Sequence, residues 1–78
     1  MVKILVCEDD RALNKLVCGY LSEQCYDITS CQNGEEGLDA LEKSTYDLII
    51  TDIMMPKLDG FELAESVRIT DKTTPIVL

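Results

Sequence analysis

The amino-acid sequence predicts an α/β protein whose parallel β-sheet is covered by helices. Short, near-continuous apolar runs alternate along the chain with segments of helical periodicity, in the order β-α-β-α-β-α-β. Such runs are typical of strands that are buried on both faces. Capping and turn residues separate the two kinds of segment. This alternation indicates a parallel sheet with right-handed crossovers, and a chain of 78 residues amounts to one domain at most.

Residues 2–7 form the first predicted strand, and three acids, Glu8, Asp9 and Asp10, follow it directly. In the next segment apolar residues recur at i, i+3, i+4, i+7 and i+8, which is one face of a helix. These residues are Leu13, Leu16, Val17, Tyr20 and Leu21. We expect Asp10 or a neighbouring residue to cap the start of this helix.

Residues 26–31 alternate loosely between polar and apolar side chains and form the second predicted strand. Asn33 and Glu36 then stand three residues apart, which is the pattern of a capping box at the start of a helix. Leu38 and Leu41 supply the buried side of this second helix, which is expected to end near residue 43.

Residues 46–52 form the third predicted strand, which is apolar in its middle and ends in Asp52. The following segment, 53–58, contains Pro56 and is expected to be a loop. The third strand therefore resembles the first in that an acid stands where the apolar run stops.

Asp59 and Glu62 repeat the capping-box spacing and predict the start of a third helix. A polar turn at 71–74 separates this helix from a fourth strand, which begins at 75–78. The sequence stops inside that apolar strand, and an unpaired apolar edge favours association. We therefore expect the chain to be a truncated piece of a longer domain that has at least one more strand and helix.

Charge and hydropathy exclude several classes of function. The chain has 7 basic and 15 acidic residues and a net charge of −8. This balance argues against direct nucleic-acid binding, because phosphate contacts need clustered Lys and Arg. The start of the chain is too short and too acidic for a signal peptide, and no apolar run approaches the roughly 18 residues of a membrane span. We therefore expect a cytosolic protein that does not engage a membrane.

The four cysteines, Cys7, Cys18, Cys25 and Cys31, include no C-x-x-C pair, and the chain has no histidine. A zinc site is therefore not expected. A disulfide framework stays open by count, since small secreted scaffolds use such frameworks. Each cysteine lies in or beside an apolar stretch, which favours reduced, buried, space-filling thiols.

The acids that end the first and third strands predict a binding site. Ligands of open parallel sheets bind at the carboxyl ends of the strands. If these two strands are neighbours, Glu8, Asp9 and Asp52 converge at one edge of the sheet. Two like charges about 5 Å apart repel by roughly 3 kcal/mol at an effective dielectric of 20, so a proton or a cation must neutralise the group. Oxygen ligands favour Mg²⁺, Mn²⁺ or Ca²⁺, and Asp52 is then a plausible nucleophile toward a phosphoryl group.

Three segments of the chain, 3–10, 47–63 and 74–78, closely resemble the receiver domain of bacterial two-component response regulators. The stretch 52–60, which reads D-x-M-M-P-x-x-D-G, is the most specific of them. The resemblance implies a flavodoxin-like, three-layer parallel sheet in the strand order 2-1-3-4. It also implies that residues 1–78 are the N-terminal part of a receiver domain, in which the fifth strand and the last helices are missing.

The resemblance assigns roles to particular residues. Asp52 matches the phosphoacceptor of the family, and Asp9 matches a direct ligand of the cation, which is Mg²⁺ in the first instance. Glu8 matches the other member of the acidic pair and is expected to act through water. Met54 matches the position whose backbone carbonyl completes the metal site. Asp10 falls outside the pair and is expected to cap a helix.

The resemblance also implies partners. The phosphoryl group comes from a phosphohistidine of a sensor histidine kinase. The chain looks most like the subfamily whose second domain is a DNA-binding winged helix, so control of transcription belongs to the parent protein and not to this fragment. The family's hydroxyl residue and lysine, at the ends of the fourth and fifth strands, would lie beyond residue 78. We therefore expect the fragment to be phosphorylated poorly.

Three other interpretations stay open from the sequence. An aspartate-nucleophile phosphohydrolase usually carries a second aspartate two residues after the nucleophile, where this chain has Met54. A flavin-binding protein of similar fold needs a phosphate loop after the first strand, where three acids would repel the phosphate. A fragment that is inert to phosphorylation would instead self-associate or exchange strands through its fourth strand.

Overall fold

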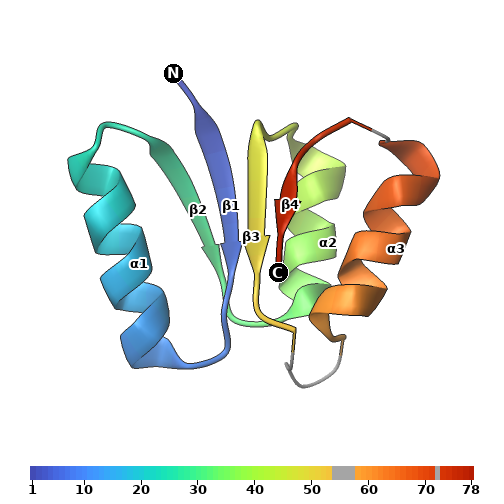
Figure 1. The fold of residues 1–78 in the computed structure, drawn as a ribbon, viewed down its shortest axis with the longest axis horizontal. Coiled ribbons are helices and arrows are strands. Elements are labelled where there is room, and N and C mark those ends of the chain that lie inside the picture. The colour runs from blue at the N-terminus through green and yellow to red at the C-terminus, as the bar shows by residue number, and fades with distance from the viewer. Residues whose placement is uncertain (54–57, 72) are drawn as a thin grey trace.

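A computed structural model describes residues 1–53, 58–71 and 73–78. Their strands form one parallel sheet in the order β2-β1-β3-β4, which confirms the predicted order. In Figure 1, α1 lies on one side of the sheet and α2 and α3 lie together on the other, so the fold has three layers. In chain order the elements are β1 (Lys3–Cys7), α1 (Arg11–Glu23), β2 (Asp27–Cys31), α2 (Gly34–Lys43), β3 (Leu48–Thr51), α3 (Gly60–Thr70) and β4 (Ile76–Val77).

The register of the sheet aligns the carboxyl ends of its central strands. Cys7, the last residue of β1, pairs with Cys31 of β2 on one side and with Thr51 of β3 on the other. The residues that follow these three therefore leave the sheet at the same edge, although they are far apart in the sequence. This alignment sets the position of the acids described below.

The main core lies between the sheet and the layer formed by α2 and α3. Leu5 and Ile49, on adjacent strands, are fully buried there, and Leu63 of α3 packs against them. Leu38 and Leu41 pack against this core from α2, as the sequence predicts. Burial of side chains of this size, at about 1.5–3 kcal/mol each, is the main source of stability for so small a sheet.

The capping boxes predicted for α2 and α3 have different outcomes. Asp59 and Glu62 form both reciprocal bonds, so the box at α3 is confirmed. At α2, the side chain of Asn33 accepts from the Glu36 N–H at 2.9 Å, but the Glu36 carboxylate accepts from the N–H of Gln32 and not from that of Asn33. The backbone at Asn33 is fully extended (φ −161°, ψ 174°), and the N–H one residue earlier is the one that this carboxylate reaches. The predicted N-cap is therefore right and the predicted box is incomplete.

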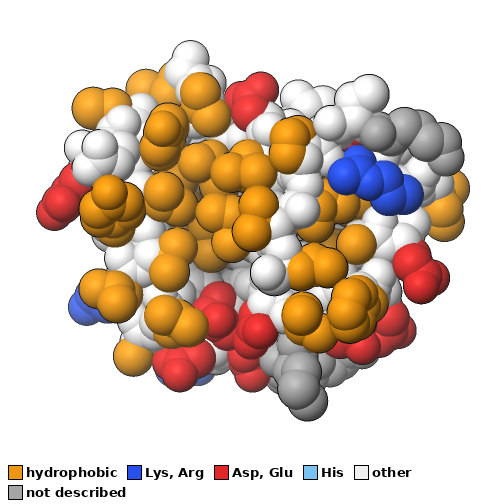
Figure 2. All heavy atoms as spheres, in the orientation of Figure 1, with side chains coloured by type: hydrophobic (Ala, Val, Ile, Leu, Met, Phe, Trp, Pro, Cys, Tyr) orange, Lys and Arg blue, Asp and Glu red, His pale blue; other side chains and the backbone are white. Residues whose placement is uncertain are grey.

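The apolar face predicted for α1 is largely exposed. Leu13, Leu16 and Tyr20 expose 44%, 70% and 63% of their surface, whereas Val17 and Leu21 are half-buried. Figure 2 shows hydrophobic side chains gathered over α1 and the sheet on the face toward the viewer. Within the described residues α1 is the only helix on this face, so one side of its apolar stripe meets the sheet and the other meets solvent.

The cysteines differ in environment, although all four thiols are free. Cys7 and Cys31 are buried as predicted, and Cys18 is half-buried. Cys25 is exposed and has a φ of 67°, so the prediction of a buried thiol is wrong there. This residue lies two positions after the last residue of α1, in the left-handed conformation, with its N–H bonded to the Ser22 carbonyl at 3.0 Å, and such helix termini lie at the surface.

Among the described residues, no helix is long and apolar enough to cross a membrane.

Candidate metal centre

Three carboxylates meet at the carboxyl ends of β1 and β3. Glu8 and Asp9 follow β1, and Asp52 follows β3. One carboxylate oxygen from each residue lies within 4.8 Å of the corresponding oxygens of the other two. Glu8 and Asp52 are half-buried and Asp9 is exposed, so the group opens to solvent. Acidic side chains gather at this end of the sheet in Figure 2, below the hydrophobic face.

Backbone hydrogen bonds between strands hold two of these acids in place. The Asp52 N–H donates to the carbonyl of Cys7 at 3.0 Å, and the Glu8 N–H donates to the carbonyl of Cys31 at 3.0 Å. The ladder of parallel pairing therefore continues past the last strand residues to the acids themselves. The carboxylates are brought together by strand pairing, which is a property of the whole sheet and not of the local sequence.

The electrostatics of the cluster show the cost of this crowding. The pKa of Glu8 is raised above its ordinary value, first because the side chain is partly removed from water. Its contacts with the Asp9 and Asp52 carboxyl groups raise the pKa further, and the bond it accepts from the Asp10 N–H, at 3.2 Å, opposes the shift. A cation bound among the three carboxylates would relieve this repulsion.

The donor set suits a hard cation. All three side chains offer oxygen, and oxygen ligands without nitrogen or sulfur favour Mg²⁺, Mn²⁺ or Ca²⁺. Asp10, the next acid along the chain, turns away to cap α1, where its carboxylate accepts from the N–H groups of Ala12 and Leu13 at 3.0 and 3.1 Å. The predicted ligand Met54 lies outside the described residues.

A glycine allows α3 to begin directly against the end of β3. A Cβ at Gly60 would lie 2.4 Å from the carbonyl oxygen of Asp52 and 2.9 Å from the Cα of Ile53. The Gly60 N–H donates to the Ile53 carbonyl at 2.9 Å, which ties the helix to the segment that carries Asp52. The stretch 52–60, which carries the resemblance, ends in Gly60, and the structure supplies the physical reason for a glycine there.

Sequence reasoning missed Asn14, a side chain of α1 that is 3% exposed and contacts the loop carrying the acids. A signal for it was present. Asn14 is three residues before Val17 in the helix, so the helical period places it on the side that faces the sheet. A polar side chain on that side needs hydrogen-bond partners, and those partners identify what it holds.

Comparison with known proteins shows the family of the chain. Residues 4–78 match the family model described as response regulator receiver domain. The chain belongs to this family. Its receiver fold matches that of the response regulator TrrA from Thermotoga maritima, crystallised in complex with Mg(2+)-BeF, with a TM-score of 0.94 and 38% identity over 100% of this chain and 68% of that one. TrrA was also crystallised in complex with the histidine kinase ThkA, and that TrrA structure matches with a TM-score of 0.89.

Curated relatives of this receiver domain include transcriptional regulators. The transcriptional regulatory protein RprY of Bacteroides fragilis is 43% identical over 76 residues, which cover 97% of this chain and 32% of RprY. The transcriptional regulatory protein CiaR of Streptococcus pneumoniae is 38% identical over 78 residues, which cover 34% of CiaR. The chain thus spans about a third of the length of the curated relatives it matches.

Proposed function

We propose that this receiver domain accepts a phosphoryl group on Asp52 from a sensor histidine kinase, with a divalent cation bound at the acidic cluster. The observation that carries the proposal is the convergence of Glu8, Asp9 and Asp52 within 4.8 Å, from two strands that are distant in sequence. In this proposal the modified domain controls an output domain of a longer cytoplasmic protein, and the regulators RprY and CiaR support transcription as that output.

The residues present fit a magnesium ion. As the family resemblance implies, Asp9 and Asp52 would hold it directly and Glu8 would act through water, and two carboxylates plus waters are a typical Mg²⁺ environment. The crystallisation of TrrA with Mg(2+)-BeF supports this choice of cation. When bound, the cation supplies positive charge that offsets the negative charge of the carboxylates and of the incoming phosphoryl group.

The chain's own residues supply the nucleophile and its position. A carboxylate oxygen of Asp52 forms a bond to phosphorus while the phosphorus–nitrogen bond of the donor phosphohistidine breaks. The electron pair of the broken bond stays on the imidazole nitrogen, which takes up a proton from water. The product is an aspartyl phosphate. The backbone bond from Asp52 to Cys7 fixes the strand end from which this side chain reaches the donor.

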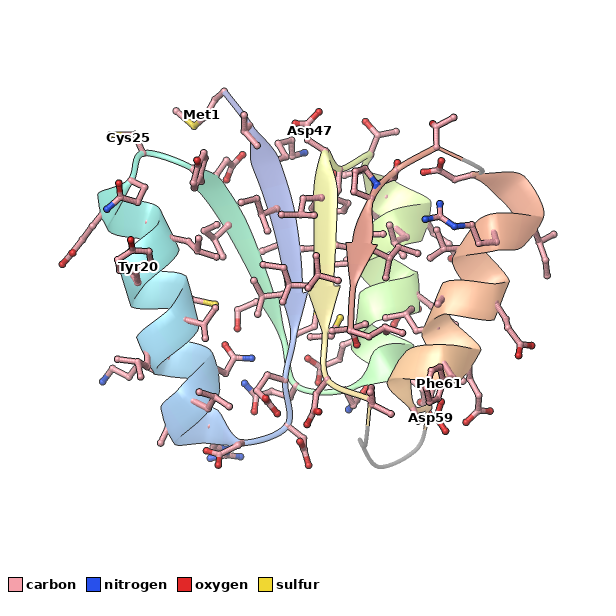
Figure 3. The ribbon with its side chains drawn as sticks, viewed as in Figure 1. Met1, Tyr20, Cys25, Asp47, Asp59 and Phe61 are labelled. Atoms are coloured by element: carbon pink, nitrogen blue, oxygen red, sulfur yellow. The ribbon has the colours of Figure 1, made fainter. Side chains whose placement is uncertain are left out.

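Intact-mass measurement with a small phosphodonor tests the proposal. The chain is incubated with acetyl phosphate and Mg²⁺, and we expect a minor fraction of the chains to gain the mass of one phosphoryl group, which hydroxylamine removes, as for an acyl phosphate. Asp52→Asn should abolish the gain, and EDTA should reduce it. The matched control is Asp47→Asn, because Asp47 lies at the opposite end of the same strand (Figure 3), where it accepts from the Lys3 N–H at 2.8 Å. A gain that persists in Asp52→Asn contradicts the proposal.

The same experiment separates this function from a phosphohydrolase. A receiver takes up phosphoryl groups in proportion to the protein present, whereas a hydrolase of this sheet type would release many equivalents of phosphate per chain. We expect only the slow release that follows hydrolysis of the aspartyl phosphate, because the sequence has a methionine at the position where these hydrolases carry a second aspartate. Release of phosphate in large excess over protein would favour the hydrolase.

A second candidate function, self-association through β4, is favoured by one observation. In the described residues β4 pairs with β3 alone, through Ile49↔Ile76 and Ile50↔Val77, and Val77 is 52% exposed. An apolar strand edge of this kind pairs readily with another chain. Sedimentation equilibrium of the chain over a range of concentrations tests it: a monomer at all concentrations rules out association, and a dimer that Val77→Lys disrupts supports it.

A further inference from the structure

The side chain of Asn14 joins three parts of the fold. Its Nδ2 donates to the carbonyl of Glu8 and to the carbonyl of Cys31, both at 2.9 Å. Its Oδ1 accepts from the hydroxyl of Ser30 at 2.5 Å and from the thiol of Cys18 at 3.3 Å. A primary amide has two N–H donors and one oxygen with two lone pairs, so every hydrogen-bonding position of this side chain is used. Asn14 therefore connects α1, the end of β2 and the loop after β1.

Two of these bonds bear directly on the acidic cluster. The Glu8 N–H donates to the carbonyl of Cys31, and the Glu8 carbonyl accepts from Asn14. Both backbone polar groups of Glu8 are thus fixed, and the peptide unit that carries the Glu8 carbonyl also begins Asp9. Asp9 is exposed and lies between β1 and α1, outside any helix or strand. Its position therefore depends on this peptide unit.

The two carbonyl groups determine how the amide is turned. A backbone carbonyl only accepts, so the amide nitrogen must face Glu8 and Cys31. The oxygen then accepts from Ser30 and Cys18, whose hydroxyl and thiol can donate. Asn14 is 3% exposed, and water has little access to replace these bonds. Removing the amide would leave the Glu8 carbonyl unpaired and the Cys31 carbonyl with the Glu8 N–H alone, and an unpaired buried polar group costs about 1–3 kcal/mol. The loop is expected to shift so that the Glu8 carbonyl reaches water.

We propose that Asn14 is a positioning residue that fixes the loop after β1 and thereby sets the place of Glu8 and Asp9 relative to Asp52. This inference rests on the function proposed above, because it assumes that the acidic cluster binds a cation. It adds a residue of α1 that contacts neither the cation nor the phosphoryl group. Replacing a residue that orients a metal ligand without contacting the metal typically lowers the metal affinity by about 10- to 100-fold.

Calorimetric titration with Mg²⁺ tests the inference. We expect Asn14→Ser, whose hydroxyl is too short to reach both carbonyls, to weaken Mg²⁺ binding by about 10- to 100-fold while the chain stays folded by circular dichroism. Asn14→Leu should weaken Mg²⁺ binding to a similar extent. If Asn14→Leu does not fold, the Mg²⁺ affinity of Asn14→Ser alone tests the inference. The control for lost stability is Val67→Ala, a core change in the C-terminal half of α3, seven residues after Gly60, which should leave the affinity within about twofold.

Amide hydrogen exchange supplies a readout that needs no metal. In Asn14→Ser the Glu8 amide should exchange faster than in the parent chain, whereas the Asp52 amide, bonded to Cys7 on the other side of β1, should change little. If the parent chain binds no Mg²⁺, the proposed function fails, and the exchange rates still test the role of Asn14. Unchanged exchange at Glu8 together with unchanged Mg²⁺ affinity in a folded Asn14→Ser chain overturns the inference.

Discussion

Replacing Gly60 by alanine tests whether α3 begins directly against the strand end that carries Asp52. The new Cβ would lie 2.4 Å from the Asp52 carbonyl oxygen and 2.9 Å from the Ile53 Cα, inside the 3.0 Å limit that real Cβ atoms observe. Both neighbours are backbone atoms, so no flexible side chain can move aside. The start of α3 and residues 52–53 must therefore separate, and the bond from the Gly60 N–H to Ile53 must lengthen.

The expected change in stability follows from comparison with a second glycine. At Gly19, inside α1, a Cβ would meet nothing within 4 Å. Gly19→Ala should therefore show only the helix-propensity gain of about 1 kcal/mol, which is a rise in Tm of roughly 4–8 °C for a domain of this size. Overpacking costs typically 1–3 kcal/mol, so Gly60→Ala should lower Tm by roughly 4 °C or more. The same chemical change is thus expected to have opposite signs at the two positions.

Thermal unfolding followed by circular dichroism measures both effects, and titration with Mg²⁺ measures the consequence for the site. Because the shift moves the Asp52 backbone, Gly60→Ala should also weaken Mg²⁺ binding, whereas Gly19→Ala should not change it. A Gly60→Ala chain as stable as the parent, with the same Mg²⁺ affinity, would refute the close approach of α3 to the cluster.

Three further predictions concern a helix terminus, a turn and the cation. Cys25→Gly should raise the free energy of unfolding by about 0.5–1 kcal/mol in urea titration. The φ of 67° at this position is sterically unfavourable for a residue with a Cβ, whereas glycine adopts it without a clash. The pKa of Asp71 is lowered from 3.8 to about 2, first by the hydroxyl of Thr74. The ionised carboxylate therefore stabilises the fold above pH 3.8, and this contribution is lost as the pH falls toward 2. Asp71→Asn should unfold at a lower urea concentration than the parent chain at pH 5 but not at pH 2. Saturating Mg²⁺, at about 100 times its Kd, should raise the free energy of unfolding by about 2.7 kcal/mol in the parent chain, and EDTA or Asp52→Asn should remove the gain.

The sequence predicts most of the fold because its signals are local. The apolar runs, the Asn33 and Asp59 caps and the period of α2 each depend on residues close in the chain, and the structure has them within a residue or two of the expected bounds. The exposure of Leu16 and Tyr20 was not predicted, because helical periodicity shows which residues share a face but not how much of that face another element covers. The incomplete capping box at α2 depends on one backbone conformation that residue identities do not specify.

The candidate site is predictable in outline for a different reason. The rule that ligands bind at the carboxyl ends of parallel strands needs only the strand order, and the resemblance implies that order, so Glu8, Asp9 and Asp52 follow. The helical period places Asn14 on the side of α1 that faces the sheet, but its role does not follow, because the two carbonyl groups that it holds carry no signature in the sequence. The need for glycine at position 60 also depends on a long-range contact between backbones.

The dependence of the acidic cluster on strand pairing has a consequence for the timing of modification. Glu8 and Asp52 reach their places through bonds to Cys31 and Cys7, so the acidic cluster exists only after β2 and β3 have docked on β1. Assembly of parallel strands requires contacts distant in sequence and is intrinsically slow. A nascent or misfolded copy would display the same acids scattered along its length. A phosphoryl donor that needs the assembled acidic cluster would not modify such copies, and only molecules that have finished folding would be phosphorylated.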